Sequence, residues 1–168
     1  MGFIFRVFVC FFCLMSNVWS QECDSSRQLS IDVTNYFINS DGTVTDLDSG
    51  LTWMRCSVGQ KWRGNACTGQ ANTFNWREAF SQEDEINRLE SNRWRLPTLS
   101  ELATIVERQC WAPRINLELF PQTPSVAYWS ANHKKGSENA FAMDFNKHGL
   151  QSLPKERRLY LRMVRGRN

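Results

Sequence analysis

The chain has few of the residues that build fibres. Its 168 residues include only 9 glycines and 5 prolines, and no heptad repeat persists, which excludes collagen-like and coiled-coil rods. Aromatic residues make up 12% of the sequence and no residue type dominates it, which excludes a disordered chain. A net charge of +3 is too small to indicate nucleic-acid binding by itself. The length favours a single domain.

Signals for catalysis and for metal or cofactor binding are also scarce. Two histidines occur, His133 and His148, and neither lies near a cysteine in the sequence. C-x-x-C pairs are absent, which disfavours a zinc site. Ser100 and Ser130 have no histidine partner in a recognisable catalytic arrangement. We therefore expect no enzymatic activity, no resident metal and no cofactor.

The first twenty residues have the pattern of a secretory signal peptide. Arg6 precedes an apolar run over residues 7–15, and Val18 and Ser20 occupy the −3 and −1 positions of a cleavage site after Ser20. That run is far shorter than the roughly 20 residues of a membrane-spanning helix, although an uncleaved membrane anchor is the alternative. Cleavage predicts an exported chain without a stable membrane span, located in the periplasm, at the cell surface or outside the cell.

Removal of residues 1–20 leaves four cysteines, and an oxidising compartment favours disulfides between them. Three pairings are possible on the sequence alone. We prefer a bond between Cys56 and Cys67, because it closes a short polar loop that contains two glycines. The second bond then joins Cys23 to Cys110 and ties the N-terminal segment to the end of a helix.

Two helices and six strands are predicted from the pattern of residues. Asn75 and Glu78 form a capping box that starts a helix over residues 76–90, and Thr98 and Glu101 form another that starts a helix ending near Gln109. Each helix has one apolar face, and both are expected to pack on a common sheet. Strands are predicted where β-forming residues lie between turns, at residues 33–39, 43–46, 51–54, 127–131, 140–145 and 159–164.

The order of these elements is strands, two helices and strands again, which favours an α+β fold with an antiparallel sheet. Residues 21–32 are polar and are expected to form a loose lead-in, whereas residues 56–71 are expected to form a loop closed by its disulfide. The predicted architecture is loop-rich and disulfide-stapled, with two helices packed on a twisted antiparallel sheet.

A series of short motifs occurs in order between residues 39 and 166: Gly42-Thr43-Val44-Thr45-Asp46, Ser49-Gly50-Leu51-Thr52-Trp53-Met54-Arg55-Cys56, Gly59-Gln60, Cys67, Trp76-Arg77-Glu78-Ala79, Trp94-Arg95-Leu96-Pro97-Thr98, Glu101-Leu102, Phe120-Pro121, Tyr128-Trp129-Ser130 and Leu161-Arg162-Met163-Val164-Arg165. Together these motifs resemble the C-terminal domain family of the Legionella collagen-like adhesin. The resemblance implies a C-type-lectin-like fold over residues 39–166. The expected domain organisation is thus a signal peptide over residues 1–20, a lead-in with a first strand over 21–38, and this domain over 39–166. The resemblance also implies export and, for the namesake domain, binding of sulfated glycosaminoglycans.

Three aspartates lie in a stretch rich in turn residues. Asp41, Asp46 and Asp48 could supply oxygen ligands to calcium. Their spacing does not match an EF-hand loop, and Asp-Gly is above all a turn dipeptide. The Glu-Pro-Asn and Gln-Pro-Asp tripeptides with which C-type lectins bind sugars through calcium are absent. Turns are therefore favoured, with a calcium site as the alternative.

Basic residues gather in the last third of the sequence. The candidate ligand-binding residues are Lys134, Lys135, Lys147, Arg157, Arg158 and Arg162. If several meet on one face, they would form a patch suited to sulfate or phosphate groups, since arginine binds such groups through two hydrogen bonds. The alternative is a solvated surface balanced by nearby acids. We expect the loops over residues 132–139 and 146–158 to contact the ligand.

The sequence thus predicts a secreted bacterial ligand-binding module that recognises an anionic glycan or another surface ligand and has no catalytic activity. The alternative is a structural or interaction subunit of a surface appendage or envelope complex, which would contact other proteins. Nucleic acid is not expected as a partner, because the chain is expected to be exported and its net positive charge is small.

Overall fold

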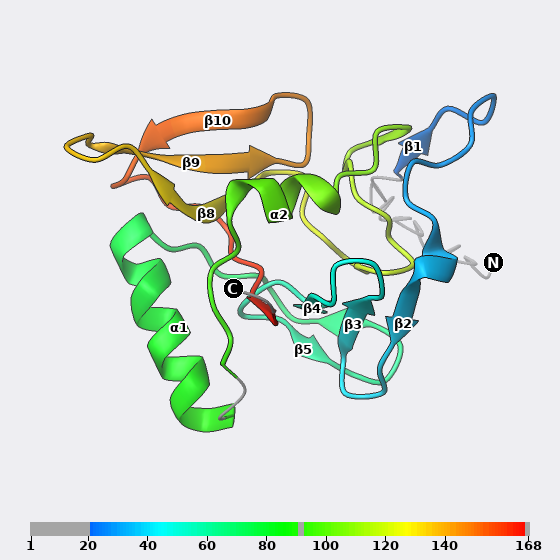
Figure 1. The fold of residues 1–168 in the computed structure, drawn as a ribbon, viewed down its shortest axis with the longest axis horizontal. Helices are drawn as coiled ribbons and strands as arrows, with labels where there is room; N and C mark the ends of the chain where they lie inside the picture. Colours follow the sequence, from blue (N-terminus) through cyan, green and yellow to red (C-terminus); the bar gives the residue numbers. More distant parts are fainter. Residues whose placement is uncertain (1–20, 91–92, 167–168) are drawn as a thin grey trace, which may run out of the picture.

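The computed structural model describes residues 21–90 and 93–166 (Figure 1). The predicted signal peptide falls on residues 1–20, outside the described part of the chain. The elements are β1 (Glu22–Cys23), a 3-10 turn (Val33–Asn35), β2 (Tyr36–Ile38), β3 (Thr43–Asp46), β4 (Thr52–Met54), β5 (Lys61–Trp62), β6 (Cys67–Thr68), α1 (Trp76–Glu90), α2 (Leu99–Thr104), β7 (Cys110–Trp111), β8 (Ala127–His133), β9 (Asn139–Asp144), β10 (Gly149–Pro154) and β11 (Val164–Arg165).

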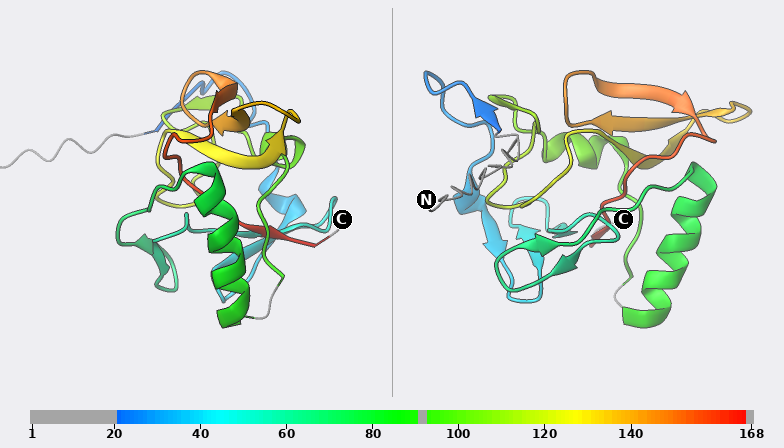
Figure 2. Two further views of the ribbon diagram at one scale, coloured as in Figure 1. Left: turned by 90° about the vertical axis from the view of Figure 1, so that its left-hand side faces the viewer. Right: turned by 180° about the vertical axis from the view of Figure 1, so that it is seen from behind.

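The predicted α+β class is confirmed, but the strands form two main sheets rather than one. One sheet has the order β10-β9-β8 and the other has the order β11-β4-β3-β2, and all of their pairs are antiparallel. Two short antiparallel pairs, β1-β7 and β5-β6, lie outside them. In the ribbon, α2 lies between the two main sheets and α1 runs down one side (Figures 1 and 2). A C-type-lectin-like topology stays a prediction from the resemblance.

The two helices cover opposite faces of the β10-β9-β8 sheet. Tyr128 of β8 and Met143 of β9 are paired neighbours, and both belong to the core that α2 closes. The next pair along, Trp129 and Ala142, belongs to a second core that α1 closes. Because successive side chains of a strand point to opposite faces, this central sheet has apolar side chains buried on both sides.

Helix α1 has the predicted bounds, and reciprocal capping explains its start. The Asn75 side chain accepts the backbone N–H of Glu78 at 2.9 Å, while the Glu78 carboxylate accepts the backbone N–H of Asn75 at 2.9 Å. The expected end of the second helix near Gln109 is wrong, since α2 ends at Thr104. The chain leaves the helix there to pair Val106 with Ile115, which requires an extended backbone.

The N-terminal segment is fixed, contrary to the loose lead-in expected for residues 21–32. The disulfide between Cys23 and Cys110 joins β1 to β7. The fully buried carboxylate of Glu107 accepts the backbone N–H of Ser30 at 2.8 Å and that of Ile31 at 3.0 Å. The strand predicted over 33–39 is a 3-10 turn followed by the three residues of β2.

The later elements differ from the predictions in three places. Strand β10 was expected to be loop, yet it pairs with β9 along its whole length. The strand predicted over 159–164 consists of isolated bridges at Leu159 and Tyr160, followed by β11. The expected loop over 56–71 contains the β5-β6 hairpin, and its disulfide joins Cys56 to Cys67. Both preferred disulfide pairings are therefore the ones found.

Candidate functional site

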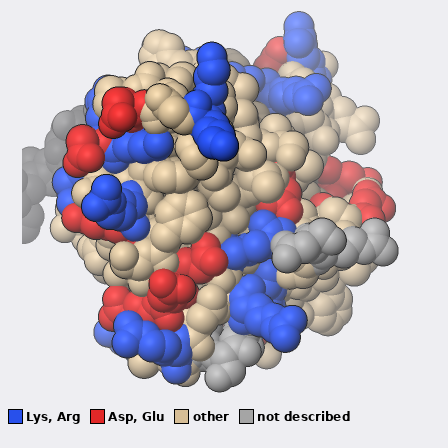
Figure 3. Space-filling view, turned by 60° about the vertical axis from the view of Figure 1, so that its left-hand side comes forward, with Lys and Arg blue, Asp and Glu red and all other residues tan. Residues whose placement is uncertain are grey.

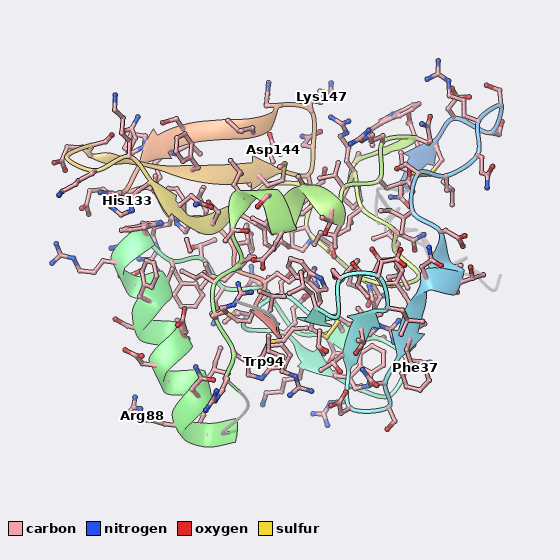
Figure 4. The ribbon with its side chains drawn as sticks, in the orientation of Figure 1. Phe37, Arg88, Trp94, His133, Asp144 and Lys147 are labelled. Atoms are coloured by element: carbon pink, nitrogen blue, oxygen red, sulfur yellow. A yellow bond between two sulfur atoms is a disulfide. The ribbon has the colours of Figure 1, made fainter. Side chains whose placement is uncertain are left out.

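The predicted basic residues do not form one patch. Lys134 and Lys135 follow β8, in the turn that leads to β9, whereas Lys147 lies in the turn between β9 and β10. These turns lie at opposite ends of β9, whose 6 residues span about 20 Å. The labelled side chains of His133 and Lys147 in Figure 4 mark the two ends. A small ligand therefore contacts one of these turns and not both.

Arg162 is not available to an external ligand, which corrects its assignment as a binding residue. Its side chain is fully buried. Nη1 donates hydrogen bonds to the backbone carbonyl oxygens of Met54, at 2.7 Å, and of Arg55. Nη2 donates to the hydroxyl of Thr123 at 2.7 Å. Burial lowers the pKa of the Arg162 guanidinium, with a partial opposing effect of Tyr128. The residue joins parts of the core instead of facing solvent.

Arg157 and Arg158 are exposed and differ in what they contact. Arg158 forms an ion pair with Glu78 at 2.7 Å and donates a hydrogen bond to the carbonyl oxygen of Thr73. The guanidinium of Arg157 has no hydrogen bond or ion pair with any residue that the structure describes. Arg157 therefore has all of its donors free for a ligand.

Both arginines line a cavity of about 390 Å³ beside β10, which we call the β10 groove. The residues around it come from the start of β8, from β9 and β10 with their connecting turn, and from the segment after β10: Ser125, Val126, Ala127, Asp144, Asn146, His148, Gln151, Leu153, Arg157, Arg158, Leu159 and Tyr160. The groove thus combines part of the predicted segment 146–158 with residues outside both predicted loops, and no residue of the other predicted loop, 132–139, lines it.

The β10 groove has apolar side chains next to polar groups without partners. Leu153 and Leu159 supply apolar surface. The side chains of Asn146, His148 and Arg157 and the hydroxyl of Tyr160 have no hydrogen-bond partner among the described residues. Binding sites for small polar molecules typically combine apolar surface with a few convergent polar groups. A sugar has this same mixture of C–H faces and hydroxyl groups.

Asp144 orders one end of the groove. Its buried carboxylate accepts the backbone N–H of Asn146 at 2.7 Å and the side-chain amide of Gln151 at 3.0 Å. The first bond fixes the turn that starts after β9, and the second orients Gln151 across the strand pair. These hydrogen bonds let Asp144 hold the groove in shape, and its carboxylate forms no ion pair with Arg157.

Charges of both signs alternate on the face shown in Figure 3. Lysine and arginine side chains there are interrupted by aspartate and glutamate, and the areas between them are uncharged. This face therefore has no continuous basic surface of the kind that binds polyanions without regard to their structure. On this face, recognition of an anionic ligand therefore depends on individual residues.

Two of the three aspartates considered for calcium stabilise turns, and the carboxylate of the third, Asp48, accepts the side-chain amide of Asn35 at 3.3 Å. Asp41 accepts the backbone N–H of Thr43 at 3.0 Å and its hydroxyl at 2.7 Å. Asp46 accepts the backbone N–H of Asp48 at 3.0 Å and the hydroxyl of Ser49 at 2.6 Å. Within residues 21–90 and 93–166, no three potential metal-ligating side chains gather at one place. These hydrogen bonds account for the Asp-Gly pattern as turn chemistry.

A second cavity, of about 360 Å³, lies between the start of α1 and the segment after β10. Its lining consists of Trp76, Arg77, Phe80, Glu138, Lys155 and Glu156, and we call it the Trp76 pocket. The Lys155 ammonium group donates to the carbonyl oxygen of Ser137 at 2.7 Å and lies 5.0 Å from the centre of the Trp76 ring. A third cavity, of about 260 Å³ beside the β5-β6 hairpin, has no lysine or arginine in its lining.

The sequence profile of the Lcl C-terminal domain family matches residues 42–165, well over half of the chain. The chain belongs to this family. The part that matches the Lcl C-terminal domain begins just before β3 and ends with β11, so it contains the β10 groove and the Trp76 pocket. Cys23 and strand β2 lie outside the matched range. No curated protein matches the chain.

Family membership and the two disulfides together indicate an exported protein. Of the helices in the described residues, none has the length and hydrophobicity needed to cross a bilayer.

Several groove residues were not predicted as site residues. Asn146 and His148 lie within the segment 146–158 that the basic residues drew attention to, but neither was among the candidate ligand-binding residues. Asp144 and Tyr160 were assigned to strands. The signal for Asp144 was present, because strand alternation places it on the face opposite Phe145 and a polar residue on a buried strand indicates a specific partner. For Tyr160 no local signal exists, since it reaches the groove through its bridge to Tyr128.

Proposed function

We propose that the protein is an exported, adhesin-like binding module that recognises an acidic glycan at the β10 groove and has no catalytic activity. Membership of the Lcl C-terminal domain family supports a surface-binding role, and the two disulfides are suited to an oxidising environment. The paired strands β9 and β10 and the hydrogen bonds of Asp144 hold the groove in one shape, which limits the conformational entropy lost on binding.

The observation on which the proposal rests is the free guanidinium of Arg157 at the edge of an amphipathic groove. A guanidinium donates two parallel hydrogen bonds to a carboxylate or sulfate. Leu153, Leu159 and the Tyr160 ring supply apolar contact for the C–H face of a sugar ring, while Asn146 and His148 supply hydrogen bonds for its hydroxyls. Arg158 adds a second positive charge, which Glu78 partly offsets.

The test is binding of the disulfide-bonded protein to immobilised acidic glycans, heparin and hyaluronan among them, at increasing salt. We expect salt-sensitive binding that Arg157→Gln weakens about tenfold or more, because a charge-assisted hydrogen bond contributes about 1.5–3 kcal/mol. The control is Arg88→Gln, which removes an equal charge at the far end of α1 (Figure 4). Equal losses in both variants, or no binding to any acidic glycan, would overturn the proposal.

A protein-contacting subunit is the second candidate, and the edge strand β2 favours it. Phe37 and Ile38 of β2 are 61% and 43% exposed, and Leu47 beside them is 60% exposed. Strand β2 is the outer strand of its sheet, and exposed apolar residues on such an edge are typical of contact sites. Cross-linking at the surface of the producing cell tests this candidate, because a subunit is recovered with fixed partners and a free binding module is not.

A further inference from the structure

The β10 groove and the Trp76 pocket share one turn of the chain. Lys155 and Glu156 line the Trp76 pocket, and the next two residues, Arg157 and Arg158, line the β10 groove. The turn is closed by a hydrogen bond from the backbone N–H of Arg157 to the carbonyl oxygen of Pro154 at 2.9 Å. Consecutive Cα atoms are 3.8 Å apart, so the Cα atoms of Lys155 and Arg158 are separated by about 11 Å at most. Four consecutive residues of one turn therefore line the two cavities, two in each.

The Trp76 pocket has an aromatic wall held in place by its neighbours. The rings of Trp76 and Phe80 meet edge to face with centroids 4.8 Å apart. The indole N–H of Trp76 donates to the carbonyl oxygen of Ser130 at 2.9 Å, which fixes the ring. Lys155 is held over this ring and forms no ion pair with a described residue. The wall is thus formed before any ligand binds.

The acids of the Trp76 pocket set the kind of group that it accepts. Glu138 and Glu156 are exposed, and their carboxylates have no hydrogen bond or ion pair with the described residues. Free carboxylates accept hydrogen bonds from hydroxyl groups and repel anions. Their charges offset those of Arg77 and Lys155, so the pocket is close to neutral. The β10 groove instead has Arg157 without a partner and Asp144 occupied by hydrogen bonds.

We infer that the ligand is an extended oligosaccharide with an uneven charge pattern, whose acidic sugar binds the β10 groove while a neighbouring uncharged sugar, rich in hydroxyls, binds the Trp76 pocket. This inference rests on the proposed function and adds the minimum length and the charge pattern of the ligand. Occupying two adjacent positions with one chain raises its affinity, because the second contact forms within an existing complex.

The first test is a length series. Glucuronic acid and hyaluronan oligosaccharides of two, four and six sugars, in which an acidic and an uncharged sugar alternate, are titrated into the disulfide-bonded protein by calorimetry. Affinity is expected to rise about tenfold or more between the single acidic sugar and the oligosaccharides, because the disaccharide is the shortest ligand that can occupy both positions. Oligogalacturonides of the same lengths are acidic at every sugar, and we expect them to bind more weakly. Equal affinity at all lengths, or tighter binding of the uniformly acidic chains, would overturn the inference.

The second test uses variants for which the inference and simple charge attraction predict opposite changes in affinity. Glu138→Ala combined with Glu156→Ala makes the protein more positive, so attraction to any polyanion would become stronger. We expect these changes to weaken binding of the hexasaccharide about tenfold and to leave binding of glucuronic acid, which lacks the uncharged sugar, unchanged. The control removes two exposed acids of α1, Asp84→Ala with Glu85→Ala. Tighter hexasaccharide binding in both double variants would contradict the inference.

These tests separate the inference from the proposed function. If Arg157→Gln weakens binding of heparin or hyaluronan but length and the two glutamates have no effect, the groove binds an acidic sugar and the second position is wrong. If no acidic glycan binds, or if Arg157→Gln has no effect on binding, the proposed function itself fails.

Discussion

The guanidinium of Arg162 donates a hydrogen bond to the hydroxyl of Thr123 at 2.7 Å, and both side chains are buried. The same group donates to backbone oxygens at the end of β4 and lies 4.8 Å from the centre of the Phe120 ring. No carboxylate of the described residues pairs with it. The arginine therefore links distant segments of the chain through neutral acceptors and the faces of two aromatic rings, Phe120 and Tyr128.

Replacing this arginine is expected to destabilise the protein strongly. Arg162→Ala leaves the carbonyl oxygens of Met54 and Arg55 without donors and opens a cavity, so we expect a loss of about 3–5 kcal/mol in the free energy of unfolding. Urea denaturation measures this loss. Arg157→Ala is the matched control, and its change should stay within about 0.5 kcal/mol because the side chain is exposed and unpaired. A loss below about 1 kcal/mol for Arg162→Ala would show that the buried network is not important for stability.

The two disulfides should contribute unequally. The bond between Cys23 and Cys110 closes a sequence separation of 87 residues, whereas that between Cys56 and Cys67 closes 11. In the chain-entropy description, the longer loop gives about 2 kcal/mol more stabilisation. Paired cysteine-to-alanine variants of each bond, compared by denaturant unfolding, measure the difference. A larger loss for the short loop would mean that the N-terminal segment is held chiefly by other contacts.

Acid should loosen the N-terminal segment through Glu107. Burial raises the pKa of this carboxyl, but hydrogen bonds from Gln109, Ser30 and Ile31 together outweigh it and place the pKa below its ordinary value of 4.5. A group with a lowered folded pKa stabilises the fold above its unfolded pKa, and this contribution is lost as the pH falls through the folded value. Unfolding followed between pH 6 and pH 2 should therefore show declining stability below about pH 4.5.

The matched variant for this pH dependence is Glu107→Gln. It keeps the size of the side chain and cannot ionise, so the variant should be less stable at pH 7 and its stability should vary less in acid. Amide exchange at Ser30 and Ile31 reports the local effect, because Glu107 accepts both of these N–H groups. Identical acid profiles for the two proteins would assign the acid sensitivity to other carboxyls.

Gly42 should tolerate no side chain. It has a positive φ of 84°, and a Cβ there would lie 2.5 Å from the Trp62 ring. Gly50 also has a positive φ, 72°, but a Cβ there would meet nothing within 4 Å. Both alanine variants lose about 1 kcal/mol to backbone strain, and Gly42→Ala should lose about 1–3 kcal/mol more through overpacking. Thermal unfolding compares them. Equal losses would mean that Trp62 moves aside without cost.

Local signals predicted the elements that local chemistry determines. The capping residues Asn75 and Glu78 located α1, and the turns around Asp41 and Asp46 located β3 and β4. The end of α2 could not be predicted, because the apolar spacing through Val106 continues past Thr104 and only the pairing with Ile115 interrupts it. Strand β10 has few β-forming residues and depends on β9 for its conformation.

The site was predicted less well for a similar reason. Arginine is almost always exposed unless it is paired, and the acceptors that hold Arg162 are backbone oxygens more than a hundred residues away. The apolar residues on either side of it, Leu161 and Met163, indicated a buried segment, and both are buried in the structure. The separation of Lys134 from Lys147 follows from β9, which lies between their two turns, and the strand predicted over residues 140–145 already implied it.

The central claim is that an acidic glycan binds beside β10, and amide chemical-shift mapping tests it most directly. The isotopically labelled, disulfide-bonded protein is titrated with a hyaluronan hexasaccharide at low salt. We expect the largest shifts in residues 125–127, 144–160 and the start of α1, and we expect Arg157→Gln to reduce them while Arg88→Gln does not. Shifts confined to the β5-β6 hairpin or to β2, or no shifts with any acidic glycan, would contradict this claim.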